Sequence, residues 1–182
     1  MSATKDKLME FYKELTDFID TYEERMVHTT LRHRTLIKAA LDAQKTSLTF
    51  KTAVGAAVKT NDGKIFIGAN IESITRSSDI HAEILAITKA LQSECKPGYK
   101  REEIMAIVVT YGAKVPARPD IEGGYAYPMC AICRQFAWEN THPDLEVIVV
   151  DPDATVIFAG PLKILYPLPY PSKVYERLNL RN

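Results

Sequence analysis

The chain has 182 residues, 46% of them hydrophobic and 25% charged, as expected for one globular domain with an ordinary core. Its 23 Lys and Arg residues balance 23 Asp and Glu residues, so no net charge attracts it to nucleic acid or an anionic membrane. The apolar runs are too short to span a bilayer, and the charged N-terminus is unlike a secretory signal. Three cysteines without a disulfide framework fit a reducing, cytoplasmic compartment.

The N-terminal quarter of the chain predicts two helices. Apolar residues recur at helical spacing over residues 4–26 and again over residues 30–44, with a hinge expected near residues 27–29. His28 and His33 are five residues apart and do not share a helix face, which favours solvent-facing or capping side chains over metal ligands. We therefore divide the chain into N-terminal helices and a main domain. Residues 1–46 hold an extension helix and a second helix that packs on the core, and residues 47–182 form the main domain with a proline-rich C-terminal tail. From Ile164 onward this tail is expected to lack regular structure.

Strands and helices alternate from Thr52 onward. The turn Asn61-Asp62-Gly63 lies between two short apolar runs and predicts a β-hairpin whose first strand is buried on both faces. The pattern predicts an α/β fold with a mixed sheet of about five strands flanked by helices. The strands are expected at residues 53–58, 65–67, 104–109, 145–150 and 156–158, and the helices of this part at residues 81–92 and 130–139.

Four residues have the types and spacing of a catalytic zinc site. His81 and the pair Cys130 and Cys133 supply one imidazole and two thiolates, which balance the charge of Zn²⁺ and leave a fourth position for water. Glu83 is two residues from a ligand and can move protons. Both ligand groups open predicted helices, and such helix starts gather at the carboxyl edge of an α/β sheet. Taken alone, Cys-x-x-Cys also fits a redox pair, a structural zinc site or two packed thiols.

Five motifs follow one another along the chain: V-G-A-A, D-G-K-I-F, G-A-N-I-E, H-A-E and P-M-C-A-I-C-R-Q. Together they resemble the motifs of the cytidine deaminase family, including those of a divergent or blasticidin S deaminase-like member. The distance from Asn70 to His81 also matches the family. The resemblance covers residues 50–170 and implies a three-layer cytidine deaminase-like fold, a homo-oligomer (tetramer or dimer), and Zn²⁺ held by His81, Cys130 and Cys133.

The resemblance also implies roles for five further residues. Glu83 would take a proton from the attacking water and pass it to N3 of the cytosine ring and then to the leaving ammonia. Asn70 and Glu72 would bind the ribose 3′-hydroxyl, the backbone N–H of Ala82 would hold the 2-oxo group, and Phe50 would stack near the base. Without the family spacing, an Asx-type turn and a solvated carboxylate would be the preferred explanations of Asn70 and Glu72.

Two departures from the family pattern keep the substrate open. Met129 separates Pro128 from Cys130, and the segment 111–127 is long, with three glycines and two prolines. The first expectation is hydrolytic deamination of cytidine and deoxycytidine, and the alternative is deamination of blasticidin S or a modified cytosine nucleoside. A second alternative is a non-catalytic, zinc-stabilised binding module. A polynucleotide editor is disfavoured by zero net charge and by the lack of a basic-aromatic stripe, so the expected partner is a small nucleoside rather than nucleic acid or membrane.

Overall fold

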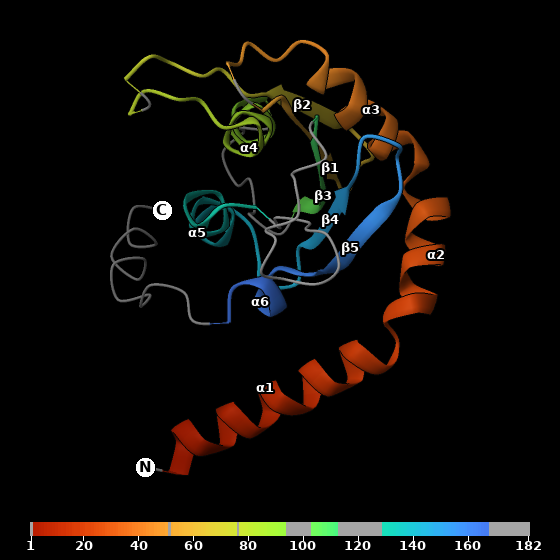
Figure 1. The fold of residues 1–182 in the computed structure, drawn as a ribbon. Coiled ribbons are helices and arrows are strands. Elements are labelled where there is room, and N and C mark those ends of the chain that lie inside the picture. The colour runs from red at the N-terminus through yellow and green to blue at the C-terminus, as the bar shows by residue number, and fades with distance from the viewer. Residues whose placement is uncertain (1, 51, 76, 94–102, 113–128, 168–182) are drawn as a thin grey trace, which may run out of the picture.

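The computed structural model describes residues 2–50, 52–75, 77–93, 103–112 and 129–167 (Figure 1). Three N-terminal helices stand where the sequence pattern predicts two, and the strands and helices that follow come in the predicted order. The elements are α1 (Ser2–Asp20), α2 (Tyr22–Arg32), α3 (Arg34–Gln44), β1 (Val54–Thr60), β2 (Ile65–Ala69), α4 (Ala82–Ser93), β3 (Ile104–Tyr111), α5 (Ala131–Asn140), β4 (Glu146–Val150), β5 (Val156–Pro161) and α6 (Leu162–Leu165).

Five strands form one mixed sheet in the order β2-β1-β3-β4-β5. The predicted hairpin is confirmed: β1 and β2 are antiparallel, and Gly63 in their turn has a φ of 85°, which favours glycine. Strand β1 also pairs antiparallel with β3, and β5 pairs antiparallel with β4. The pairing of β3 with β4 is parallel, as expected for strands joined through a helix.

The sheet has a hydrophobic core on each face, so the fold has three layers (Figure 1). Side chains alternate across β3: Ile107 and Val109 pack on the side of α4 and α5, while Ala106 and Val108 pack on the side of α3. The predicted three-layer architecture is therefore confirmed.

Two glycines let helices approach the sheet closely. A Cβ on Gly55 would lie 2.2 Å from the carbonyl oxygen of Ala40 in α3, and one on Gly68 would lie 2.2 Å from the carbonyl oxygen of Ala82 in α4. Both positions therefore exclude any larger side chain unless the helix backbone moves. Gly68 matters for the site, because Ala82 is the first residue of the helix that carries Glu83.

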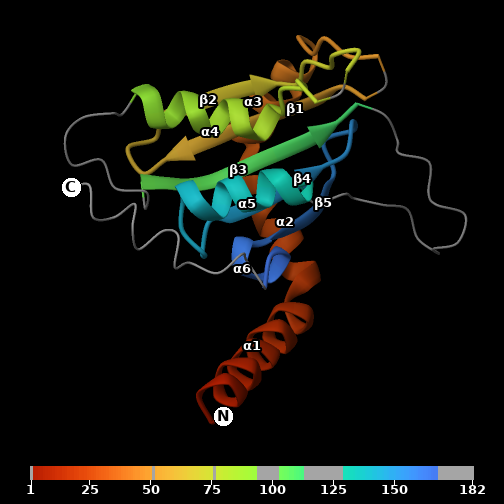
Figure 2. The same cartoon turned by 90° about the vertical axis from the view of Figure 1, so that its left-hand side faces the viewer.

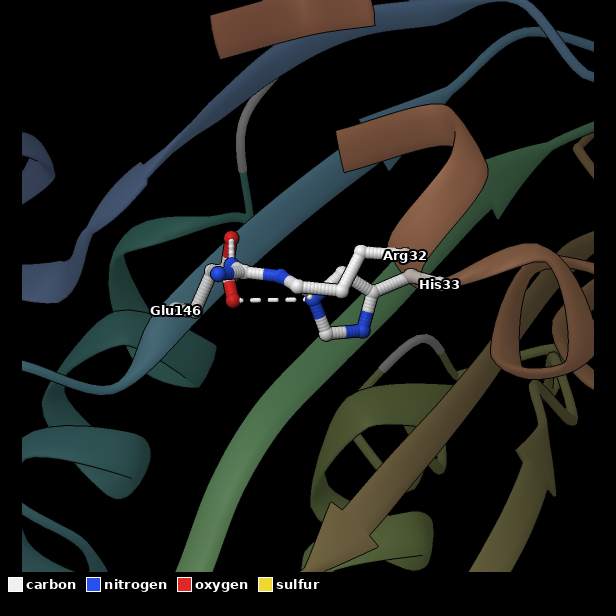
Figure 3. A network of polar contacts seen from close by, with 3 residues as sticks. All are labelled: Arg32, His33 and Glu146. Carbon is white, nitrogen blue, oxygen red and sulfur yellow. Dashed lines mark hydrogen bonds and ion pairs between the residues drawn. The ribbon is translucent and has the colours of Figure 1, made fainter. Parts of the chain in front are cut away.

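The N-terminal helices end at other residues than the sequence pattern predicts. The predicted hinge at residues 27–29 is wrong, since α2 runs through it and the breaks lie at Thr21 and His33. His28 is exposed, as expected, but His33 is only 7% exposed, so the expectation of a solvent-facing or capping side chain is wrong for this residue. Its Nε2 lies 2.9 Å from Oε2 of Glu146 on β4, and Arg32 contacts the same carboxylate (Figure 3).

The C-terminal end of the described chain also differs from the expectation. The segment from Ile164 was expected to lack regular structure, but Ile164 and Leu165 belong to the short helix α6. The rest of the proline-rich tail from residue 168, and residues 113–127 of the segment 111–127 that was expected to be a loop, lie outside the described residues. Among the helices that the structure describes, none is long and apolar enough to cross a membrane.

Candidate active site

The candidate metal ligands meet where two helices begin. His81 directly precedes α4, Cys130 is the N-cap residue of α5, and Cys133 lies in the first turn of α5. The isolated bridge between Ile71 and Ile80 holds the chain just before His81. Figure 2 shows α4 and α5 starting at the same end of the sheet, at which β3 also ends. The prediction that both helix starts lie together is confirmed.

The three donor atoms have the separations that a tetrahedral zinc site needs. Nδ1 of His81 lies 3.4 Å from Sγ of Cys130 and 3.3 Å from Sγ of Cys133, and all three donor atoms lie within 4.8 Å of one another. Zn–S bonds of about 2.3 Å and Zn–N bonds of about 2.0 Å at tetrahedral angles require N···S separations of about 3.5 Å. One nitrogen and two sulfurs are also a donor set that zinc prefers. The residues therefore fit a zinc ion.

The two thiols share one proton. The hydrogen bond from the Cys133 thiol is the main cause that lowers the pKa of Cys130 to about 5. The same hydrogen bond, together with burial, raises the pKa of Cys133. Cys130 is exposed and Cys133 is buried. The lowered pKa of Cys130 and the raised pKa of Cys133 favour a thiolate at the exposed position and a thiol at the buried one when no metal is bound. A cation in this position can replace the shared proton and stabilise both thiolates.

Glu83 places a carboxyl group beside the three donors. It lies in the first turn of α4 and is only 3% exposed. Burial is the main cause that raises its pKa, while a backbone hydrogen bond and the thiol of Cys133 act in the opposite direction. A buried carboxyl with a raised pKa can both accept and donate a proton near neutral pH, as proton transfer requires.

Asn70 is buried and holds the segment that precedes β1. Its Oδ1 accepts hydrogen bonds from the backbone N–H of Val54, at 2.7 Å, and from the hydroxyl of Ser47. Its Nδ2 donates to the carbonyl oxygen of Thr52, at 2.9 Å. Both lone-pair positions of the amide oxygen are thus in use, and among the described residues Thr52 is the one acceptor for Nδ2, which carries two N–H groups. These bonds join residues 16 to 23 positions apart, so Asn70 links two distant segments and does not form the local Asx-type turn considered from the sequence.

Glu72 and Phe50 belong to the same group of contacts. Oε2 of Glu72 accepts a hydrogen bond of 2.6 Å from the backbone N–H of Phe50, and the ring of Phe50 is 71% exposed. An isolated bridge between Leu48 and Ile71 ties the two segments together. The structure thus brings Phe50, Asn70 and Glu72 into one group, and it gathers His81, Glu83 and the two cysteines into another.

Two other positions clarify the sequence expectations. Ala82, the first residue of α4, is fully buried, and Met129 is fully buried in the core on the side of α4 and α5. The extra residue before Cys130 is therefore accommodated by the core, while Pro128 lies outside the described residues.

Sequence reasoning missed Tyr111, which it treated as the start of a loop. The alternation of Ile107 and Val109 toward α4 and α5 is the signal that would have included it.

Comparison with known proteins agrees with this geometry. Residues 31–149 match the family model described as the cytidine and deoxycytidylate deaminase zinc-binding region. The chain is 36% identical over 112 residues to a probable cytidine deaminase of Dictyostelium discoideum. The matched region covers 62% of this chain and 65%, just under two thirds, of that protein.

Solved structures have a similar fold. The crystal structure of cytidine deaminase from Burkholderia pseudomallei has a TM-score of 0.62 and 31% identity, over 76% of this chain and 98% of that one. The structure of cytidine deaminase from Mycobacterium leprae has a TM-score of 0.54 and 26% identity, over 74% of this chain and 97% of that one. About a quarter of this chain lies outside each of these two matches.

Proposed function

This chain belongs to the family of cytidine and deoxycytidylate deaminases with a zinc-binding region, and we propose that it is an aminohydrolase that deaminates cytidine and deoxycytidine. The observation that carries the proposal is the position of Glu83. Its buried carboxyl group lies beside a His-Cys-Cys donor set, which a purely structural zinc site would not need.

The proposed chemistry follows from the residues of this chain. His81, Cys130 and Cys133 would hold Zn²⁺, which supplies Lewis-acid activation of a water molecule. Glu83 accepts a proton from that water as its oxygen bonds to C4 of the cytosine ring, and it delivers the proton to ring N3. Glu83 then transfers the second water proton to the amino nitrogen, the C4–N bond breaks, and ammonia leaves. Cytidine and water thus give uridine and ammonia.

Substrate binding is proposed for the second group of residues. Asn70 would donate its remaining N–H to the ribose 3′-hydroxyl, and Glu72 would accept a hydrogen bond from the same hydroxyl. The backbone N–H of Ala82 would hold the 2-oxo group, and the exposed ring of Phe50 is available to stack on the base. A modified cytosine nucleoside, or blasticidin S, is the second candidate substrate, because Met129 stands between Pro128 and Cys130, where the family pattern has proline directly before the cysteine.

We further propose that the protein is a homo-oligomer, a tetramer or a dimer, and acts in the cytoplasm. Large apolar side chains are exposed in the segments that carry the proposed site residues, and such a surface marks a binding region. They are Leu48, Phe50, Ile74, Ile80 and Ile132. Light scattering tests the assembly, and a monomer mass at micromolar concentration would contradict it.

The test of the activity is loss of the cytosine ultraviolet band during incubation with zinc-loaded protein, beside the Glu83→Gln variant. We expect uridine and ammonia from the wild type, and no product from the variant despite one zinc per chain. If the wild type binds zinc but leaves cytidine and deoxycytidine intact, these substrates are wrong, and blasticidin S and modified cytosine nucleosides are assayed next. If none of them is converted, the binding-module alternative replaces the enzyme.

A further inference from the structure

Helix α1 carries a row of exposed apolar side chains. Leu8, Tyr12 and Ile19 are 51%, 56% and 62% exposed. The main domain holds the C-terminal half of the helix, where the ring of Phe18 packs on that of Phe158 with centroids 5.8 Å apart. Figures 1 and 2 show the N-terminal part of α1 projecting away from the sheet. An apolar row on a projecting helix marks a surface for contact with another molecule.

The row has the spacing of a coiled-coil seam. Leu8, Tyr12, Leu15 and Ile19 follow one another at intervals of four, three and four residues. These intervals read the same from either end of the helix. In an antiparallel pair about a two-fold axis, Leu8 therefore lies level with Ile19 of the second copy, and Tyr12 lies level with Leu15 of the second copy. The row is thus complementary to itself, as a two-fold contact requires.

The charges along the helix favour the antiparallel direction. Residues 14–24 contain five Asp and Glu residues and no Lys or Arg, whereas residues 2–13 contain three Lys and two Asp or Glu residues. A groove of about 750 Å³ lies at the acidic end of α1. Apolar and acidic residues line it, among them Phe18, Ile19, Phe158, Asp20, Glu23 and Glu24. An antiparallel second copy brings Lys7 and Leu8 to this groove, whereas a parallel copy would place carboxylates beside carboxylates.

We propose that the exposed row of α1 is a docking surface for α1 of a second copy of this chain, in an antiparallel pair about a two-fold axis. The inference goes beyond the proposed function and does not rest on it. Helix α1 precedes residues 31–149, which match the family model, so this surface is an addition to that region. An isolated helix of this length is only marginally stable in water, and pairing stabilises it by covering its apolar row.

The test is mild oxidation of the Leu8→Cys/Ile19→Cys variant of the full chain. We expect a disulfide-linked dimer in which peptide mapping finds the thiol introduced at position 8 joined to the one at position 19. Along one helix these positions are about 16 Å apart, too far for a disulfide, so the link forms only between copies. The matched control is Glu10→Cys/Asp17→Cys, which places thiols at corresponding levels on the other side of the helix and should give no link.

A further substitution in the Leu8→Cys/Ile19→Cys variant tests the row itself. Tyr12→Glu puts a charge into the seam and should lower the yield of linked dimer by about 10-fold or more. Lys13→Gln changes the net charge by the same amount outside the row and should leave the yield unchanged. All the substituted side chains are exposed, so the fold should be retained.

Three results would overturn the inference. The first is no link between positions 8 and 19, or an equal yield from Glu10→Cys/Asp17→Cys. The second is an unchanged yield with Tyr12→Glu. The third is efficient linking of the single variant Leu8→Cys to its own copy, because that result indicates a parallel pair.

Discussion

Nε2 of His33 lies 2.9 Å from Oε2 of Glu146, although the two residues are 113 positions apart. His33 separates α2 from α3, and Glu146 is the first residue of β4 (Figure 3). Arg32 contacts the other oxygen of the carboxylate. This contact attaches the junction of the N-terminal helices to the start of β4, and Glu146 is its common acceptor.

The Glu146→Gln substitution should lower the free energy of unfolding by about 1–3 kcal/mol at pH 7, because it removes the charge from a hydrogen-bonded and largely buried group. Burial raises the pKa of Glu146, but the hydrogen bonds and charges of His33 and Arg32 more than offset it, so the net shift is downward. The stabilisation is therefore complete above the unfolded-state pKa of about 4.3 and is lost as pH falls through the lower folded-state pKa. Urea unfolding at pH 7 and pH 3 measures it.

The matched control for this carboxylate is Asp42→Asn. Asp42 also accepts from two cations, Lys38 and Lys45, but it lies on the exposed surface of α3. We expect almost no change in stability from this variant, because solvent screens exposed pairs. A Glu146→Gln effect as small as that of Asp42→Asn, or one that does not decrease in acid, would show that the contact does not stabilise the fold.

Gly68→Ala should weaken zinc binding by about tenfold or more. The new methyl group would lie 2.2 Å from the carbonyl oxygen of Ala82 and 2.8 Å from the backbone nitrogen of Ala86, so the start of α4 must move away from β2. His81 directly precedes this helix, and a displaced ligand loses metal affinity. Competition with a chromogenic chelator measures the zinc affinity.

Gly55→Ala provides the comparison for Gly68. Its methyl group would meet the carbonyl oxygen of Ala40 at the same 2.2 Å, but in α3 on the opposite face of the sheet. Both variants should lose about 1–3 kcal/mol of stability through overpacking. Only Gly68→Ala should also lose zinc affinity; equal zinc affinities in the two folded variants would refute the link between Gly68 and the ligand position.

Asn70→Ala should lower the free energy of unfolding by about 1–3 kcal/mol, because it removes the partners of the Val54 N–H and the Thr52 carbonyl. If Asn70 also binds the sugar, KM for cytidine should rise beyond any loss of folded protein. Chemical unfolding and steady-state kinetics at a temperature where the variant is folded separate the two effects. Asn61→Ala changes an exposed turn residue and should alter neither quantity. Unchanged stability of Asn70→Ala would contradict the structural role.

The strands and the zinc ligands could be predicted because their signals are local. The hairpin has its turn at Asn61-Asp62-Gly63, and the ligand residues open two helices, so period and spacing were sufficient. The positions of Asn70 and Glu72 depended on the family resemblance. Their hydrogen bonds to the segment before β1 join residues 16 to 22 positions apart, which no local pattern shows.

The breaks at Thr21 and His33 could not be predicted, because the apolar period continues through the first and two arginines flank the second. Tertiary contacts determine both. The hydroxyl of Tyr22 donates to the Ile157 carbonyl on β5 just after the first break. At the second, the partner of His33 is Glu146, and charged neighbours in the sequence conceal a buried histidine. Tyr111 was missed for a related reason, since a strand end and a loop start look the same without a partner strand.

Removal of zinc should expose a difference between the two cysteines. In chelator-treated protein, iodoacetamide should modify Cys130 quickly at pH 7, because it is exposed and its pKa is about 5, so it is a thiolate. Cys133 is buried and its pKa is raised, so it should react slowly. The rate at Cys130 should decrease as pH falls through about 5, where the thiolate takes up its proton. Peptide mapping by mass spectrometry assigns the modified residue at each time point.

Zinc-loaded protein is the control for this reactivity, and both cysteines should then be protected. His81→Ala removes the third donor and should leave Cys130 reactive even when zinc is supplied, because two thiolates alone hold the metal weakly. The same rate for Cys130 and Cys133 in the metal-free protein would contradict the shared proton. Protection by zinc that persists fully in His81→Ala would remove this histidine from the ligand set, and with it the geometry from which the role of Glu83 is argued.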